Sequence, residues 1–214
     1  MSGLPAYFWE RRAEIAVLAG QHLLLVAFST ALAVAVGLPL GIALTRRPRL
    51  AHPVLGFASV VQTIPSLALF GLLIPLPLIG GIGARTAVVA LIVYALLPIL
   101  RNTHAGITSV DPATVEAAVG LGMTPGERLR LVELPLALPV VLAGVRIAAV
   151  VSIGLATIAA AIGAGGLGVL IYRGIATVDN RLILAGAVPA ALLALALDGG
   201  LGLLERRWSR WRSA

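Results

Sequence analysis

The residues best suited to act on another molecule lie in a polar segment, 111–135, between two strongly apolar stretches. This segment holds four of the chain's nine acidic residues. Glu116 is followed directly by Ala117 and Ala118, so a carboxylate stands beside two of the smallest side chains. Small side chains keep a helix slim and let another protein surface approach closely. The pattern is consistent with docking of a partner and equally with a surface loop that carries solvated charges.

The chain has no pattern typical of a catalytic or metal site. It contains no HExxH or GxSxG motif, no paired catalytic acids and no cysteine. Its histidines, His22, His52 and His104, lack metal-ligand spacing and are interpreted as interfacial. The glycine-rich run 162–168 lacks the Lys-Ser/Thr of a phosphate-binding loop, so we expect close helix packing or a re-entrant turn there. No enzymatic activity, metal, cofactor or bound ATP is expected in this chain.

The composition is that of a chain whose solvent is lipid. Hydrophobic residues make up 59% of it and charged residues 12%, with a mean hydropathy of +1.03, whereas a soluble domain carries about 25% charged residues. The sequence pI of 11.4 would suit a nucleic-acid binder. The arginines, however, stand in short clusters beside apolar stretches, which is typical of membrane orientation. We expect contact with the lipid bilayer and none with nucleic acid.

Five stretches are long and apolar enough to cross the bilayer as helices, for which about 20 apolar residues suffice. They are 22–44, 54–78, 86–100, 138–162 and 182–204, the third of which needs residues from Gly80 onward to reach full length. A sixth follows if the proline-rich region 54–85 divides into two passes. The first stretch is too long for the apolar core of a signal peptide and is expected to be retained. We predict an all-α polytopic membrane protein with a single domain, 1–214.

The distribution of arginine predicts the orientation of the chain. With five spans and the N-terminus outside, the inner segments would be 45–53, 101–137 and the C-terminal tail, which includes Arg210 and Arg212. These segments hold ten arginines and the outer segments hold five. Membrane proteins carry an excess of basic residues on their cytoplasmic side. The prediction is a multi-pass protein of the inner membrane, with segment 111–135 and the C-terminus in the cytoplasm.

The first part of the polar segment carries signals for a short helix. Asp111 can accept from the free N–H groups of a first turn, and Pro112 is preorganised for the first helical position. A helix from Pro112 to about residue 121 follows. Gly122 suits the left-handed position just after its end.

The second part of the segment predicts another short helix. Thr124 and Glu127 match the capping box, in which each side chain binds the backbone N–H of the other residue. Leu134-Pro135 is expected to end this helix. The segment 111–135 is therefore predicted to be a pair of short helices joined by a turn, beneath the membrane.

Two charges fall inside predicted spans, Arg146 and Asp198. An ionised side chain within the bilayer is costly and is usually paired or able to reach an interface. At 1.5 Å per residue, Arg146 lies about 12 Å and Asp198 about 9 Å from the cytoplasmic ends of their spans. The two can meet as a structural ion pair; reaching the interface separately and contact with a substrate are the alternatives.

Four polar groups are placed at membrane depth by the predicted spans: Gln62, Thr63, Ser66 and Tyr94. Such groups line transport pathways, but they also form hydrogen bonds between helices. The sequence leaves both interpretations open.

The polar segment resembles the EAA loop of the ABC-importer permeases. That pattern is EAA, three residues, Gly, nine residues and Ile-x-Leu-Pro, and this chain departs from it only by Val132 in place of Ile. In the family, this segment forms a coupling helix that fits a groove on a separate ATP-binding subunit. The resemblance implies that the docking residues are Glu116, Ala117, Ala118, Gly122, Leu134 and Pro135.

Further strings resemble the osmoprotectant branch of these permeases, which import quaternary amines such as glycine betaine, choline or carnitine. They are VVQTIPSLALFGLLIPL, YALLPILRNTHAGI, VDPATVEAAVGLGM and ATIAAAIGAGGLG. The resemblance, over roughly 20–205, implies the type I ABC importer permease fold. It also implies ATP-binding subunits that bind the ATP, a second permease copy or a homologous permease, and an extracytoplasmic substrate-binding protein. Aromatic cages hold quaternary ammonium ions, and with 5% aromatic residues here recognition is expected on the binding protein.

Other functions fit the sequence less well. An ABC importer of another small solute, such as an amino acid, would share the same loop. A secondary transporter would ordinarily need more helices and buried carboxylates, whereas Asp198 is the only acid within a predicted span. A purely structural subunit would not need an EAA-type loop.

Overall fold

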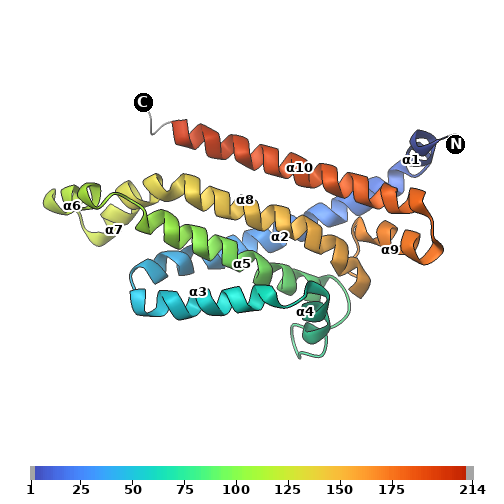
Figure 1. The fold of residues 1–214 in the computed structure, drawn as a ribbon, viewed down its shortest axis with the longest axis horizontal. Helices are drawn as coiled ribbons and strands as arrows, with labels where there is room; N and C mark the ends of the chain where they lie inside the picture. The colour runs from blue at the N-terminus through green and yellow to red at the C-terminus, as the bar shows by residue number, and fades with distance from the viewer. Residues whose placement is uncertain (1–2, 211–214) are drawn as a thin grey trace.

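The computed structural model describes residues 3–210 and the side chains up to residue 207, so Arg212 and the side chain of Arg210 lie outside the described part. This part is all-helical, with long helices that run side by side along one axis (Figure 1). In chain order the elements are α1 (Leu4–Glu10), α2 (Arg12–Thr45), α3 (Pro48–Thr63), α4 (Ser66–Leu73), α5 (Ala84–Thr108), α6 (Pro112–Gly120), α7 (Pro125–Arg128), the π-helix η1 (Leu129–Glu133), α8 (Leu134–Ala159), the 3-10 helix η2 (Ala160–Ile162), α9 (Gly168–Thr177) and α10 (Asn180–Arg210).

Four helical stretches are long and apolar enough to cross a membrane, and α3 with α4 makes a fifth if this bent pair is one span. The two are bent by 99° because Pro65 disfavours a helical conformation at Ile64, which is extended at φ −66° and ψ 126°. The eight residues of α4 extend only about 12 Å, against about 30 Å of bilayer core. The region therefore does not divide into two passes, and a sixth span is not supported.

The structure corrects several predicted boundaries. Helix α2 begins at Arg12 rather than at residue 22, and α5 continues past residue 100 to Thr108. α5 does not start near Gly80, because Gly81 and Gly83 have left-handed φ values of 110° and 116°. It gains its length at the other end instead. Helix α9 was not predicted.

Glycines bring three of the long helices into close contact. A Cβ on Gly41 of α2 would lie 2.7 Å from Thr103 Cβ of α5, and one on Gly144 of α8 would lie 2.5 Å from Asn102 Cβ. Small residues at such crossings let helix backbones approach within a membrane. The most extensive helix contacts are those of α5 with α2 and with α8, so α5 is the centre of the bundle.

The glycine-rich run forms a tight turn, as expected. Gly163, Gly165 and Gly166 have φ values of 76°, 82° and 78°, which favour glycine. A Cβ on Gly168 would lie 2.0 Å from the carbonyl oxygen of Thr157, so α9 packs closely on α8 at this point.

The prediction that the histidines are interfacial is wrong for His22. Its side chain is fully buried, and its Nε2 donates to the carbonyl oxygen of Ile153, 3.1 Å away on α8. The space for the ring comes from Gly166, where a Cβ would lie 3.0 Å from His22 Nδ1. His52 is exposed and His104 is half-buried.

The contact between α2 and α5 predicts that Gly41→Leu destabilises the protein. The new side chain would overlap Thr103, and overpacking of this kind costs about 1–3 kcal/mol. The measurement is the thermal unfolding midpoint of the purified chain in detergent. Gly20→Leu, on the same helix, is the matched control, because a Cβ there meets nothing within 4 Å. Equal shifts in the two variants would contradict the prediction.

Candidate functional site

Helix α6 begins as its sequence predicts. The side chain of Asp111 accepts from the backbone N–H of Ala113 at 3.1 Å, and Pro112 occupies the first turn. This cap supplies an acceptor to an N–H group that has no partner within the helix. The start of α6 is therefore fixed by local interactions alone.

The end of α6 is fixed by Gly122, which has a φ of 80°. The N–H of Met123 donates to the carbonyl of Ala118 at 3.2 Å, and that of Gly122 donates to the carbonyl of Val119 at 2.9 Å. This pair of bonds is the Schellman motif, which needs a left-handed residue at the position of Gly122. Nothing lies within 4 Å of a Cβ placed there, so the requirement is conformational rather than steric.

The capping box at the start of α7 is present. Thr124 Oγ1 accepts from the N–H of Glu127 at 3.3 Å, and the N–H of Thr124 donates to Glu127 Oε2 at 2.8 Å. Hydrogen bonds from the Thr124 hydroxyl and then from its backbone lower the pKa of Glu127 below its ordinary value. The capping box therefore joins Thr124 and Glu127 through both backbone and side-chain atoms.

The prediction that Leu134-Pro135 ends the second helix is wrong. Helix α7 continues through η1 into α8, and the whole stretch Pro125–Ile162 has 38 residues. The N–H of Leu134 bonds to the carbonyl of Leu129, five residues back. This π-type turn changes the hydrogen-bond register just before Pro135, where the missing N–H would otherwise break the helix. At 1.5 Å per residue the stretch is about 57 Å long, so it extends well beyond a bilayer core.

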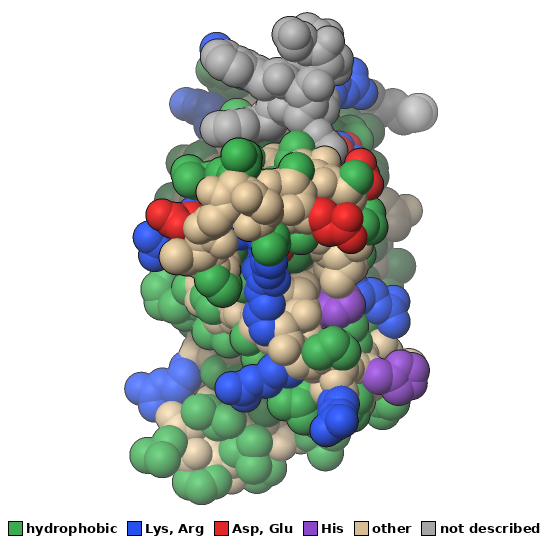
Figure 2. Space-filling model, turned by 90° about the vertical axis from the view of Figure 1, so that its left-hand side faces the viewer, with side chains coloured by type: hydrophobic (Ala, Val, Ile, Leu, Met, Phe, Trp, Pro, Cys, Tyr) green, Lys and Arg blue, Asp and Glu red, His purple; other side chains and the backbone are tan. Residues whose placement is uncertain are grey.

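The residues of the polar segment 111–135, called the EAA-like segment below, differ in exposure. Glu116 and Ala117 are exposed, and next to them Leu121 has 79% of its surface exposed. Ala118 is only 3% exposed, which corrects its predicted place on a docking surface: its methyl group faces this chain. Figure 2 looks onto the end of the molecule that carries α6 and α7, where apolar side chains lie between acidic and basic ones.

Leu134 and Pro135 lie beside a shallow groove at the same end. Leu134 is half-buried and Pro135 is exposed. Together with Arg130 and Leu138 they line a hollow of about 330 Å³. The surface formed by Leu134 and Pro135 therefore lies at the start of α8, between α6 and the apolar part of α8.

Sequence reasoning missed Glu133, an acidic residue that is buried in the structure. Arg46, at the end of α2, binds both of its oxygens, and Arg128 Nε donates to Oε1 at 2.9 Å. The available signal was an acid directly before an apolar span, with arginines in two predicted inner segments. Its partners are 87 and five residues away in the chain, so the sequence did not indicate the pairing.

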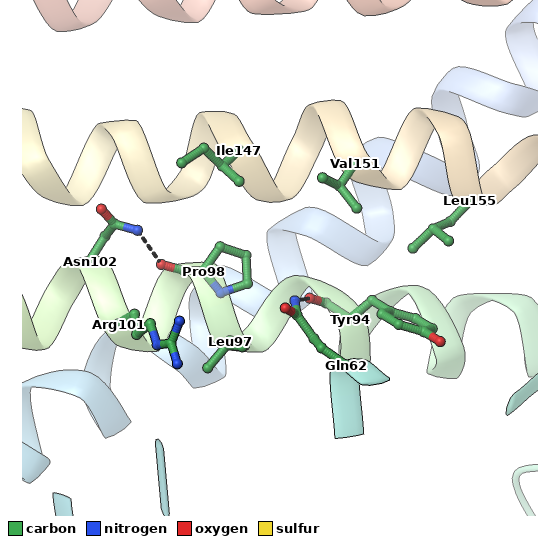
Figure 3. Close-up of a pocket in the computed structure, with 9 residues that line it drawn as sticks. All are labelled: Gln62, Tyr94, Leu97, Pro98, Arg101, Asn102, Ile147, Val151 and Leu155. Carbon is green, nitrogen blue, oxygen red and sulfur yellow. Dashed lines mark hydrogen bonds between the residues drawn. The ribbon is translucent and has the colours of Figure 1, made fainter. Parts of the chain in front are cut away.

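Two of the four polar residues predicted at membrane depth come together in a groove between α5 and α8. Gln62 Nε2 donates to the carbonyl of Tyr94 at 2.9 Å, and the Tyr94 hydroxyl donates to the carbonyl of Ile64. Figure 3 shows Gln62, Arg101 and Tyr94 across from the apolar side chains of α8. The groove has a volume of about 390 Å³ and is lined by Gln62, Tyr94, Leu97, Pro98, Arg101, Asn102, Ile147, Val151 and Leu155.

The other two polar residues do not line this groove. Thr63 is exposed and its hydroxyl donates to the carbonyl of Val60 at 2.7 Å, while Ser66 is half-buried at the start of α4. Arg101 and Asn102 line the groove although sequence reasoning did not assign them to it. The Arg101 guanidinium donates to Ser59 Oγ at 2.8 Å, which holds it at the edge of the groove.

The structure brings Arg146 and Asp198 together. Arg146 Nε lies 3.2 Å from Asp198 Oδ1, and Arg146 Nη1 lies 3.1 Å from Glu205 Oε2, a partner that sequence reasoning left out. A Cβ on Gly202 would lie 2.9 Å from Arg146 Nη1, so this glycine leaves room for the guanidinium over α10. The three charges join α8 to α10 and, unlike Glu133, remain partly exposed. Among residues 3–210, no group of three histidine, aspartate or glutamate side chains is arranged to hold a metal ion.

Comparison with known proteins gives consistent matches over nearly the whole chain. Residues 34–210 match the family described as binding-protein-dependent transport system inner membrane component. The chain is 52% identical to the osmoprotectant import permease protein OsmW of Salmonella typhimurium, over 93% of this chain and 94% of that protein. It is 42% identical to the glycine betaine/carnitine/choline transport system permease protein OpuCB of Bacillus subtilis, over 97% of this chain and 94% of that protein.

The fold also resembles a solved structure. A chain of the MetNI methionine ABC transporter, in an inward-facing conformation, superposes with a TM-score of 0.84 at 24% identity. The match covers 93% of this chain and 98% of that one. The order and packing of the helices are thus those of that transporter chain.

The cap of α6 predicts that Gly122→Val loosens the end of this helix. An L-residue in the left-handed region costs about 1–2 kcal/mol, so the amides of residues 119–123 should exchange roughly tenfold faster. Hydrogen–deuterium exchange with mass spectrometry measures this rate. Gly126→Val is the control. The φ of Gly126 is not left-handed, and a Cβ there would meet nothing within 4 Å. Unchanged exchange in the first variant would refute the role of the cap.

Proposed function

Because the chain belongs to the binding-protein-dependent transport inner membrane components, we propose that it moves a quaternary-amine osmoprotectant, of the glycine betaine, choline or carnitine type, across the inner membrane. It is the non-catalytic permease subunit of an ABC importer and works with an ATPase and a binding protein. The observation that carries the choice of cargo is the identity of 42–52% to permeases named for these solutes, over more than nine-tenths of the chain.

The proposed contact with the ATP-binding subunit is the exposed side of α6. Glu116 and Ala117 on this helix offer a carboxylate and a small side chain, and Leu121, directly after its end, offers an apolar one. Ala118 and Gly122 support this surface from within, because they belong to the Schellman motif that ends the helix. Leu134 and Pro135 extend the docking region along α8. ATP is bound by the partner.

The proposed orientation places α6, α7 and the C-terminus in the cytoplasm. In Figure 1 the end of α10 lies at the same end of the bundle as α6, and α1 lies at the opposite end. This agrees with an odd number of spans and with the excess of arginine in the inner segments. It also places the Arg146 cluster in the half of the bundle nearer the cytoplasm.

The groove between α5 and α8 is the proposed part of the pathway in this subunit. Gln62 and Tyr94 give it polar atoms, and a second permease copy or a homologous permease would close its open side. Thr63 and Ser66 would line the pathway only if the second permease extends the pathway along α3 and α4. Conversion between inward- and outward-facing states follows from ATP-driven movement of α6, which the continuous helix α7–η1–α8 carries into the bilayer.

The first test is uptake by the complete complex in proteoliposomes. Radiolabelled glycine betaine, choline or carnitine, delivered by the binding protein, should accumulate only with ATP on the cytoplasmic side, and vanadate should abolish the uptake. Methionine serves as the control solute. Uptake that persists without ATP would favour a secondary transporter, and uptake of methionine alone would refute the proposed cargo.

The second test addresses the docking helix. Glu116→Lys reverses an exposed charge on α6 and should weaken retention of the ATP-binding subunit by roughly tenfold, as is typical for a charge at a protein interface. Co-purification from the membrane measures it. Glu10→Lys makes the same change at an exposed residue of the opposite end and should leave retention unchanged. Normal retention and uptake with Glu116→Lys would contradict docking through α6.

A further inference from the structure

Glu133 is a buried carboxylate that belongs neither to the docking surface nor to the groove. Its side chain is 4% exposed and is bound by Arg46 and Arg128. A buried charge is tolerated only when it is paired and hydrogen-bonded. Here both oxygens accept from Arg46, and Oε1 also accepts from Arg128 at 2.9 Å.

The π-helix explains how Arg128 reaches this carboxylate. In an α-helix, residues five apart lie about 140° apart around the axis and cannot face each other. In a π-turn, residues five apart lie one above the other, because the backbone bond itself joins i to i+5. Arg128 and Glu133 have this spacing across η1. The wider turn thus does more than accommodate Pro135: it brings this pair together.

The third member of the cluster comes from a distant element. Arg46 follows directly after α2, and 87 residues separate it from Glu133. One carboxylate therefore joins the end of α2 to the point where the EAA-like segment becomes the membrane helix α8. Leu129 of η1 and two residues of α2, Leu38 and Ile42, pack against the same apolar cluster of Ile107, Ala137 and Val141, so apolar side chains also link η1 to α2 here.

We propose that Glu133 is a positioning residue that couples movement of the docking helix α6 to α2, so that α2 moves together with α8. The inference rests on the proposed function, since it concerns the step between ATPase docking and the opening of the pathway. α8 is joined to the loop through a continuous helix, whereas α2 is joined to it by side chains only. Loss of the carboxylate would leave docking of the ATP-binding subunit intact, but α2 would no longer move together with α8.

The test compares uptake with ATP hydrolysis in the reconstituted complex. Glu133→Gln removes the charge and keeps the shape; it should retain the ATP-binding subunit and hydrolyse ATP, while uptake per ATP falls by roughly 2- to 30-fold. Arg46→Gln breaks the same contact and serves as a second variant if Glu133→Gln does not accumulate. It should fold because Arg46 is 38% exposed and Glu133 stays paired with Arg128. Glu14→Gln is the matched control: Glu14 also binds two arginines, Arg11 and Arg173, but near the other end of α2.

The double variant Arg46→Gln/Glu133→Gln decides whether the two residues act through one contact. If they do, the double variant loses no more uptake per ATP than the more impaired of the two single variants. Multiplied losses, unchanged uptake per ATP, or release of the ATP-binding subunit by Glu133→Gln would each overturn the proposal. Absence of uptake by the unaltered complex would instead refute the proposed cargo, so the two failures are distinguishable.

Discussion

The bundle depends on the close approach of three helix backbones. Lipid tails are as apolar as the side chains that face them, so burial of apolar surface does little to hold helices together in a bilayer. What remains is contact between surfaces that fit closely, and glycine makes it possible. Gly41 brings α2 against Thr103 of α5, and Gly144 brings α8 against the neighbouring residue, Asn102. α5 is therefore the common support of α2 and α8.

This packing gives the charged clusters their roles. Within the bundle α2, α5 and α8 pack closely, and at the end of α2 Glu133 adds a charged contact to Arg46 and Arg128. In the proposed mechanism a movement of α6 enters the bundle there and reaches the groove between α5 and α8. Arg146 with its two carboxylates joins α10 to the same unit.

Much of the loop could be predicted because its structure is local. The caps at Asp111, Gly122 and Thr124 each involve residues within a few positions of one another, and all three are present. The break between α3 and α4 follows from the geometry that Pro65 imposes on its neighbour. Such features depend on the chain alone and not on what surrounds it.

The features that sequence reasoning missed depend on distant contacts. Glu133 meets Arg46 across 87 residues, and His22 is buried because a glycine turn from near residue 166 lies against it. The π-turn was hidden because Leu134-Pro135 indicates a helix end when only local rules apply. The burial of Ala118 likewise depends on how α6 lies against η1.

Site-specific cross-linking tests most directly whether α6 is the contact with the ATP-binding subunit. The chain contains no cysteine, so a single one can be placed at will. Leu121→Cys, directly after the last residue of α6, should cross-link to the ATP-binding subunit in native membranes. Leu195→Cys, at a comparably exposed leucine of α10, should not. No cross-link from position 121, or equal cross-linking from both positions, would contradict the account.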